Sequence, residues 1–455
     1  MRILIKFRKS IMLVCKLFML FAVVCAFIGC WQNYYEEAVY EYRGNYLVVF
    51  AYAVIFFLFA HLYSGFKIGT MRVHEAIYSM FLSLVMANFI MYMVLCLIAR
   101  QLLPPAPMAS TTVLQTVLVA GGVIASNSIY FSLYRVRHIL AVFGTEMADW
   151  DIIQKMANIK ERYVIDRGIS ISQGLEAVKA AIDKYEAVLI GDLEKSAKNE
   201  VLRYTYATRK RIYLLPSVND IILNNCYQSH IFDTPVLVCR NGGLTTEQQI
   251  IKRAMDIVLS LLILVITSPI MLLTAMGIKL CDGGPVFYKQ NRVTQNGRIF
   301  NIYKFRSMAV DAEKDGAARA VQGDRRVTKI GRILRPLRID ELPQLFNVLK
   351  GDMSLVGPRP ERTENVHAYV QMCPEFNLRH RVKAGITGYA QVYGKYNTSP
   401  LDKLNMDLIY IEQYSVLLDL KLLIMTLKIP FMRESSEAFK KGEDRVSRTE
   451  EEKTQ

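Results

Sequence analysis

Four long apolar stretches near the start of the chain constrain its fold more than any other feature. They lie near residues 11–30, 46–65, 76–99 and 113–134. Because a helix rises about 1.5 Å per residue, about 20 residues cross a ~30 Å hydrocarbon core, and each stretch is long enough. The pattern predicts a membrane-embedded α-helical unit of four spans over residues 1–136, and it argues against a wholly soluble protein.

Charged residues around these stretches predict their orientation. Basic residues precede the first stretch (Arg2, Lys6, Arg8 and Lys9), separate the second from the third (Lys67 and Arg72) and follow the fourth (Arg135 and Arg137). The loop after the first stretch is instead dominated by glutamates: Glu36, Glu37 and Glu41. The positive-inside rule then places both ends of the unit in the cytoplasm. A cleaved signal or lipoprotein peptide, with Phe27-Ile28-Gly29-Cys30 as a lipobox-like end, is the alternative. Lys16 interrupts that apolar run, however, and three further spans follow.

A regular series of short β-type runs marks a second region, residues 137–248. The runs are Ile139–Phe143, Tyr163–Ile165, Ala187–Ile190, Arg211–Leu215 and Pro235–Cys239, with helix-like polar segments between them. Strands that alternate with helices predict a parallel sheet covered by helices, a Rossmann-like α/β domain. Only Gly144 follows the first run, so the glycine-rich turn of dinucleotide-binding domains is missing. We therefore expect a structural or regulatory domain.

A fifth apolar stretch, Ile257–Ile278, lies near the start of a third region, residues 249–433. Its length would allow a fifth span, but Ser268 and Pro269 lie near its middle, where proline removes a backbone donor and bends a helix. A fifth span would also export most of this region, which holds 27 basic and 16 acidic residues, against the positive-inside rule. We expect a re-entrant helix over residues 254–278 in a monotopic α/β domain, and a disordered charged tail at 434–455.

The chain carries a net charge of +15, from 56 basic and 41 acidic residues, which predicts anionic partners. One run of basic residues with no acidic residue among them fits lipid headgroups or substrate phosphates: Arg325, Arg326, Lys329, Arg332, Arg335 and Arg338. No aromatic platform accompanies this run, so nucleic acid is not expected as a partner. Eight cysteines are scattered without a C-x-x-C pair, which favours reduced thiols over a zinc site or a disulfide framework.

An acidic pair, Asp340-Glu341, is the strongest candidate for chemistry. It precedes a proline and a short amphipathic helix that a glycine ends, and Arg359 follows in a rigid Gly-Pro-Arg-Pro turn. Adjacent carboxylates at a helix start commonly do no more than complement the helix dipole. Here Arg335 and Arg338 lie within two turns of the pair. Carboxylates among arginines suit Mg²⁺-assisted phosphoryl chemistry, because the metal and the cations neutralise phosphate.

The third region resembles the catalytic domain of the monotopic polyprenyl-phosphate phosphoglycosyl transferases, the bacterial sugar transferases. Besides the segment around the acidic pair, the matching motifs follow in order over nearly the whole region: Lys252-Arg253 with the Ser268-Pro269 helix, Gly284–Val293 (Gly-Pro-Val-Phe-Tyr-Lys-Gln-Asn-Arg-Val), Tyr303–Met308 (Tyr-Lys-Phe-Arg-Ser-Met) and Gly385–Val392 (Gly-Ile-Thr-Gly-Tyr-Ala-Gln-Val). The preceding regions resemble, more weakly, the accessory N-terminus of the large membrane-anchored members.

The resemblance implies a reaction and its partners. Members move a sugar 1-phosphate from a UDP-sugar to a polyprenyl phosphate such as undecaprenyl phosphate, with Mg²⁺ bound at the site, and release UMP. This step initiates capsule, O-antigen or exopolysaccharide synthesis at the cytoplasmic face of the bacterial inner membrane. The likeness also implies a covalent phosphoglycosyl-aspartate, so that a soluble donor and a lipid acceptor use one site in turn. The four-span unit and the α/β domain offer surfaces for a homodimer.

By the same resemblance, Asp340 is the nucleophile and a magnesium ligand, and Glu341 handles a proton or positions the metal. The matching basic positions that hold the pair and the substrate phosphates are Lys304, Arg306, Arg335 and Arg359. Lys395 stands where the family often has arginine, while Thr294 and Ala384 replace a common glycine and proline away from the pair. A lysine cannot grip phosphate with two parallel hydrogen bonds, so Lys395 bears on donor geometry or sugar preference rather than on activity.

Two other functions fit parts of the pattern. A catalytically silent membrane scaffold or regulator would use the α/β domain to sense a metabolite, but the intact acidic pair and the missing glycine-rich turn argue against it. A conventional glycosyltransferase would form a glycosidic bond directly and release a nucleoside diphosphate. The leaving nucleotide therefore separates that enzyme from a phosphoglycosyl transferase.

Overall fold

The computed structural model forms two compact units, residues 1–215 and 216–455, which are described separately below. The structure describes residues 7–35, 44–134, 136–144, 152–153, 156, 162–239, 242–309, 324, 326–394 and 398–429. The predicted tail at 434–455 and Lys395 lie outside the described residues.

The first unit begins with the four predicted long helices. They are α2 (Arg8–Tyr34), α4 (Gly44–Leu62), α5 (Val73–Ala99) and α6 (Ala106–Leu133), and each contains the greater part of one predicted apolar stretch. All four are long and apolar enough to cross a membrane, as is a fifth helix in the second unit. Their inward faces pack as one apolar cluster, while phenylalanines such as Phe18, Phe50 and Phe89 stay exposed on the outer faces, as expected for helices that face lipid.

A buried polar network joins these four helices. The Tyr52 hydroxyl of α4 donates to Asn88 Oδ1 of α5 at 2.8 Å, and Asn88 Nδ2 donates to Gln115 Oε1 of α6 at 2.8 Å. Gln115 Nε2 donates in turn to the Val23 carbonyl oxygen of α2 at 2.9 Å and to the Tyr52 hydroxyl at 2.8 Å. Because these polar groups satisfy one another, the bundle can bury them among apolar side chains.

A four-stranded parallel sheet follows in the same unit, as predicted. Its strands are β1 (Arg137–Phe143), β2 (Tyr163–Ser170), β3 (Ala187–Ile190) and β4 (Arg211–Leu214), in the order β2-β1-β3-β4. Helices α8 (Leu175–Ile182) and α9 (Lys195–Ala207) connect the later strands. Alternate residues of β1 enter two different apolar clusters, so this central strand is buried on both faces.

The fifth predicted strand, Pro235–Cys239, is present as a strand, but its predicted place in the parallel sheet is wrong. In the second unit, after α10 (Val218–Asn224), strands β5 (Tyr227–Ile231) and β6 (Thr234–Val238) form an antiparallel hairpin of their own. Two residues, Phe232 and Asp233, join the strands, which suits a hairpin and is far too short for a parallel crossover. The spacing of apolar runs alone could not distinguish these two connections.

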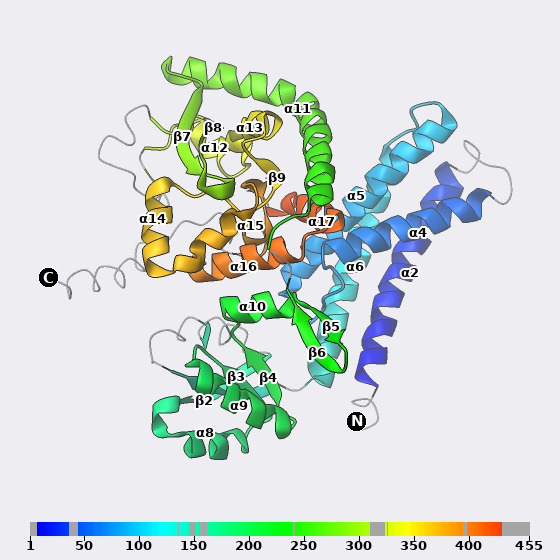
Figure 1. Cartoon of the computed structure of the whole chain (residues 1–455). Helices are drawn as coiled ribbons and strands as arrows, with labels where there is room; N and C mark the ends of the chain where they lie inside the picture. Colours follow the sequence, from blue (N-terminus) through cyan, green and yellow to red (C-terminus); the bar gives the residue numbers. More distant parts are fainter. Residues whose placement is uncertain are drawn as a thin grey trace. The chain divides into compact units, whose positions relative to one another are not determined.

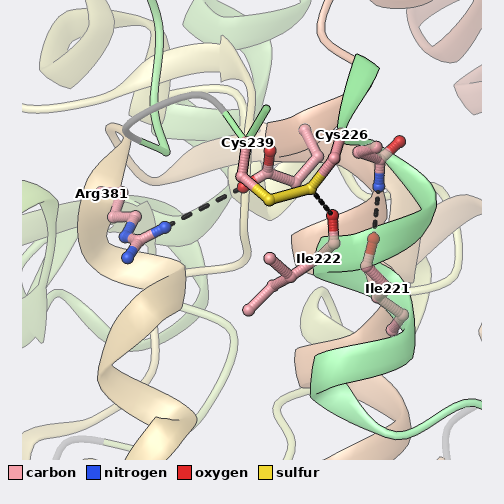
Figure 2. The surroundings of a disulfide bond; sticks show 7 residues. Ile221, Ile222, Cys226, Cys239 and Arg381 are labelled. Carbon is pink, nitrogen blue, oxygen red and sulfur yellow. Dashed lines mark hydrogen bonds and ion pairs between the residues drawn. A yellow bond between two sulfur atoms is a disulfide. The ribbon is translucent and has the colours of Figure 1, made fainter. Parts of the chain in front are cut away.

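The prediction of reduced thiols throughout is also wrong for one pair. Cys226 and Cys239 form a disulfide across the open end of this hairpin (Figure 2). The register pairs Tyr227 with Val238, so the residues just outside them lie opposite each other. The thirteen-residue separation matches no metal or redox motif, and only the hairpin register brings the two cysteines together.

The second unit is built around α11 (Thr246–Asp282), two short sheets and a set of short helices. Strands β7 (Phe287–Val293) and β8 (Ile299–Phe305) pair antiparallel, and β9 (Ser354–Val356) pairs parallel with β10 (Gly385–Thr387). The helices are α12 (Gly331–Leu334), α13 (Gln344–Lys350), α14 (Thr363–Met372), α15 (Tyr389–Tyr393), α16 (Pro400–Glu412) and α17 (Val416–Thr426), with the 3₁₀ segments η2 (Gln295–Gly297), η3 (Ile339–Glu341) and η4 (Pro374–Arg381). Buried residues of both sheets and several helices share one apolar core.

Helix α11 is longer than the predicted stretch and is bent, as Figure 1 shows. A capping box of Thr245 and Gln248 begins it, and Gly283 ends it in the left-handed conformation at φ +69°. Pro269 lies inside the helix, and the Ser268 hydroxyl donates to the Val265 carbonyl oxygen at 2.8 Å. Proline and serine together are a common cause of such a bend.

Candidate active site

The acidic pair lies in η3, between α12 and α13. Arg338, directly before η3, has a left-handed backbone with φ 54°, an uncommon conformation for a residue with a side chain. The turn at Arg338 redirects the chain between the basic helix α12 and the apolar helix α13. Asp340 and Glu341 therefore sit on a short, tightly turned segment rather than inside a regular helix.

Glu341 is held by three cationic side chains. Its Oε1 accepts from Lys304 Nζ of β8 and from Arg359 Nη2, each at 3.0 Å, and Arg338 Nη1 lies 3.6 Å from its Oε2. Burial by itself raises the pKa of the Glu341 carboxyl, but the charges of these three neighbours outweigh burial and hold the pKa below its ordinary value. Glu341 is therefore a fixed carboxylate.

Asp340 is placed differently. Within the described part of the chain, no hydrogen bond or ion pair engages its carboxylate, which is half-buried beside Glu341. Burial and then the negative charge of Glu341 raise the pKa of Asp340 above its ordinary value. The positive charges of Lys304, Arg335 and Arg359 act in the opposite direction. The pair thus contains one carboxylate that cations hold and one open carboxylate that no described side chain binds.

The predicted basic residues take different places around the pair. Lys304 and Arg359 contact Glu341 directly. Arg335, at the end of α12, contributes positive charge at Asp340 while its Nε donates to the Ser307 hydroxyl at 2.9 Å. The buried guanidinium of Arg306 lies beside Gly284, just beyond the end of α11, where a Cβ would come within 2.5 Å of it.

The turn that carries Arg359 is fixed by its neighbours. Gly385 donates its backbone N–H to the Pro358 carbonyl oxygen at 2.9 Å. Arg379 Nη2 donates to the Arg359 carbonyl oxygen at 2.9 Å, and Arg292 Nη1 donates to the Pro360 carbonyl oxygen at 3.0 Å. Three successive carbonyl groups are therefore occupied, and the Arg359 side chain is left to reach Glu341.

The sequence placed Arg338 near the acidic pair without giving it a role, and it did not assign Arg292 and Arg379 to the site. For Arg338 there was a signal, since a residue three positions before Glu341 can reach it across one turn. Arg379 is buried and forms an ion pair with the equally buried Asp407 at 2.7 Å, a long-range contact that the sequence does not display. Arg292 and Arg379 donate hydrogen bonds to backbone carbonyl oxygens. Because any arginine can make such a bond, the sequence does not show which arginines do.

The acidic pair offers few protein ligands for a metal ion. Among the described residues there is no group of three or more His, Cys, Asp or Glu side chains that could hold one. Mg²⁺, however, often binds through one or two carboxylates and completes its octahedron with water and substrate phosphates. The open carboxylate of Asp340 fits that mode, whereas a site formed entirely by protein ligands does not fit these residues.

Comparison with known proteins assigns the family. A family model described as bacterial sugar transferase matches residues 247–433. A UDP-glucose:undecaprenyl-phosphate glucose-1-phosphate transferase of Caulobacter vibrioides is 40% identical over 201 residues, which cover 43% of this chain and 75% of the relative. The chain belongs to the bacterial sugar transferase family. All of the site residues described above lie within the matched range.

Two other relatives match less of their own length. A UDP-N-acetylgalactosamine-undecaprenyl-phosphate N-acetylgalactosaminephosphotransferase of Aeromonas hydrophila is 48% identical over 181 residues, or 39% of this chain and 43% of the relative. A UDP-glucose:undecaprenyl-phosphate glucose-1-phosphate transferase of Klebsiella pneumoniae is 38% identical over 270 residues, or 57% of each chain. This bacterial sugar transferase thus spans about half the length of these two relatives.

Proposed function

We propose that the protein transfers a sugar 1-phosphate from a UDP-sugar to a polyprenyl phosphate such as undecaprenyl phosphate and releases UMP. The relatives that match are named for this kind of reaction, with glucose or N-acetylgalactosamine as the sugar. The observation that carries the proposal is the contrast within the acidic pair. Glu341 is held by cations, whereas the adjacent carboxylate of Asp340 is open.

The proposed reaction has two steps. In the first, an Asp340 carboxylate oxygen attacks the β-phosphorus of the UDP-sugar, a P–O bond forms, and the bond to the bridging oxygen breaks so that UMP leaves with the electron pair. In the second, a phosphate oxygen of polyprenyl phosphate attacks the same phosphorus and releases the Asp340 carboxylate. A covalent intermediate allows a water-soluble donor and a lipid acceptor to react in sequence at one site.

The cations around the pair are suited to these steps. Arg335 and Lys304 contribute positive charge at Asp340, which favours an anionic phosphate close to an anionic nucleophile. Because Glu341 already occupies Lys304 and Arg359, it fixes the direction of both side chains before substrate arrives. A raised pKa also makes the ionised Asp340 carboxylate a stronger base, and so a better nucleophile, than an ordinary aspartate.

We further propose Mg²⁺ as the cofactor, and Asp340 as the residue that would hold it together with water and the donor phosphates. When bound, the ion would neutralise phosphate charge and orient the leaving group. The open Asp340 carboxylate supports this proposal.

The proposed setting is the cytoplasmic face of the bacterial inner membrane, with α11 entering and leaving on the same side. Contacts at both ends of α11 support re-entry. Near its start, Lys252 Nζ lies 2.5 Å from Asp419 Oδ2 of α17, and near its end, Ile278 packs with Phe305 and Leu334. A helix that crossed a ~30 Å hydrocarbon core would separate its two ends and could not keep both of these contacts with one compact unit.

The test is covalent labelling. Detergent-extracted protein is incubated with a UDP-sugar labelled in the β-phosphate, without polyprenyl phosphate, and then quenched for peptide mass spectrometry. Wild type should carry a phosphosugar on the Asp340 peptide and release about one equivalent of UMP, as a single-site covalent intermediate requires. Asp340→Asn should show neither, because an amide nearly preserves shape but removes the attacking charge. Asp233→Asn, in the exposed hairpin turn, should behave as wild type.

Other outcomes favour the alternatives. Label on another residue, or normal turnover with lipid but no label on wild type, would contradict Asp340 as the nucleophile. Release of UDP instead of UMP would identify a conventional glycosyltransferase. Binding of donor without any released nucleotide would favour a catalytically silent scaffold.

A further inference from the structure

Helix α13, which follows the acidic pair, is capped by a residue from the membrane helix. Arg253 of α11 donates from Nη1 to the Val348 carbonyl oxygen at 2.6 Å and from Nη2 to the Leu349 carbonyl oxygen at 2.7 Å. These carbonyl groups belong to the last turn of α13, whose C-terminal end carries partial negative charge. The Gly351 backbone N–H also reaches the Val348 oxygen, at 3.0 Å, so Arg253 adds a second donor there. A planar guanidinium can bind both oxygens at once, which an ammonium group cannot do in the same geometry.

The end of α13 is shaped to receive this side chain. Gly351 ends the helix in the left-handed conformation at φ +94°, and a Cβ at this position would lie 3.5 Å from Arg253 Nη2. Lys383 lies close by, and burial together with the positive charge of Arg253 lowers its pKa. Cationic side chains thus gather at the negative end of a seven-residue helix.

Two buried contacts fix Arg253 along α11. Lys252, the preceding residue, donates to Asp419 Oδ2 at 2.5 Å and to the Tyr410 hydroxyl at 3.1 Å. Asp256, one turn later, accepts at Oδ1 from the Leu355 backbone N–H at 3.0 Å. Contacts with α17, α16 and β9 therefore hold α11 on both sides of Arg253 without the help of α13.

The segment that carries the acidic pair and α13, residues 339–350, also contacts α11 at its other end. Ile339 and Leu342, which flank the acidic pair, pack against the cluster formed by Ile278, Phe305 and Leu334, together with Met271 and Ala275 of α11. Between the two ends, Asn347 accepts from the Tyr303 backbone N–H at 2.9 Å and ties α13 to β8, the strand that carries Lys304. The start of α11 therefore holds one end of residues 339–350, and its last turns hold the other.

We propose that Arg253 is a positioning residue for the acidic pair, which it holds in place by capping α13. This inference rests on the proposed function, since it takes Asp340 and Glu341 as the reacting pair. Without the cap, the last turn of α13 loses two charge-assisted hydrogen bonds, and the helix can shift along β8, carrying Glu341 away from Lys304 and Arg359. A displacement of about 1 Å at reacting atoms can lower a rate by about 10²-fold.

Two variants of Arg253 and one control variant test the proposal in the full-length, detergent-extracted protein. The measured quantity is the rate at which the phosphosugar label forms on Asp340. Arg253→Lys keeps the charge but not the two-oxygen contact, and Arg253→Ala removes both. We expect both to label about 10²-fold more slowly than wild type. The UDP-sugar concentration for half-maximal rate should stay unchanged, because Arg253 contacts no substrate. Added guanidinium ion should partly restore the rate of Arg253→Ala, since the ion can occupy the vacated cap.

Arg298→Lys is the matched control. Arg298 is an exposed arginine near the same end of α13, but it pairs with the Asp352 side chain at 2.7 Å rather than with the helix carbonyl groups. It should label at the wild-type rate.

Wild-type labelling rates in both Arg253 variants would overturn the inference. So would a loss that appears only as a weaker apparent affinity for the UDP-sugar and that guanidinium does not relieve. Failure of the wild-type protein itself to form the Asp340 label would instead contradict the proposed function. If Arg253→Ala does not fold, Arg253→Lys decides by the same rate comparison.

Discussion

Asp340 and Glu341 are adjacent in the chain but have different surroundings. Glu341 holds Lys304 and Arg359 at 3.0 Å each, and its pKa lies below the ordinary value for a glutamate. Asp340 has an elevated pKa because of burial and the neighbouring Glu341 charge. Their roles should separate accordingly, with Glu341 arranging the cations and Asp340 reacting.

Glu341→Gln should leave a slow enzyme that still labels on Asp340. The amide keeps the shape of the side chain but no longer balances the three cations, and loss of one preorganised electrostatic contact at a reacting site typically lowers a rate by ~10²–10³-fold. The measurement is the rate of label formation on the Asp340 peptide. Glu364→Gln, an exposed position at the start of α14, serves as the control and should match wild type. An inactive Glu341→Gln without any label would argue against this separation of roles.

We expect His380 to make the stability of the fold depend on pH. Burial, and secondarily the charge of Arg379, lower the pKa of His380 to about 4 from its ordinary value of 6.5. The folded state thus favours neutral His380, so this contribution to stability is complete above pH 6.5 and is lost as pH falls toward 4. His380→Gln cannot gain a proton and should lose less stability than wild type between pH 7.5 and about 4.5. Thermal unfolding in detergent measures this, and identical pH profiles would contradict the assignment.

At the scale of elements, the hydropathy pattern predicted the long helices and the strands of the parallel sheet. The four long helices and the four parallel strands follow from local apolar patterns, because each element buries a face that its own sequence shows. Pro235–Cys239 has the same pattern, yet Val238 pairs antiparallel with Tyr227, since the two-residue turn and not the apolar run decides the partner. The predicted acidic pair and helix α13 are where the sequence placed them, because glycine and proline mark their limits.

The parts of the site that escaped prediction depend on contacts between distant residues. Arg253 is 95 residues from Val348, and Arg379 is 20 residues from the Arg359 carbonyl oxygen that it binds. Each donates to backbone oxygen, which every residue possesses, so neither partner shows a distinctive side chain. Only the fold shows which of the many arginines meets which carbonyl group.

Pro269→Ala should straighten α11. The substitution restores a backbone donor inside the helix and removes the steric cause of the bend. A straighter helix would displace Lys252 from Asp419 or Ile278 from Phe305 and Leu334, so the acidic pair would lose its placement and labelling of Asp340 should fall strongly. Leu272→Ala, an exposed position in the same half of α11, is the control and should retain labelling. Full activity in Pro269→Ala would contradict the role of the bend.

At the scale of the whole molecule, re-entry of α11 predicts one-sided labelling. Single cysteines at Gln249 and Lys329, both exposed, are introduced into a background without native cysteines. Membrane-impermeant thiol reagents should reach both from the cytoplasmic side, because the chain returns to the side from which it entered. Labelling from opposite sides would show that α11 spans the membrane.

The Tyr52, Asn88 and Gln115 network of the helical bundle also bears on how the chain is made. Its donors and acceptors come from all four helices, and Gln115 belongs to the last of them to be synthesised. Until α6 emerges, Tyr52 and Asn88 lack that partner, and an unsatisfied polar group in hydrocarbon costs several kcal/mol. The earlier helices therefore avoid this free-energy cost if they remain at the insertion machinery until the fourth helix arrives. We expect the bundle to enter the bilayer as one assembly rather than helix by helix.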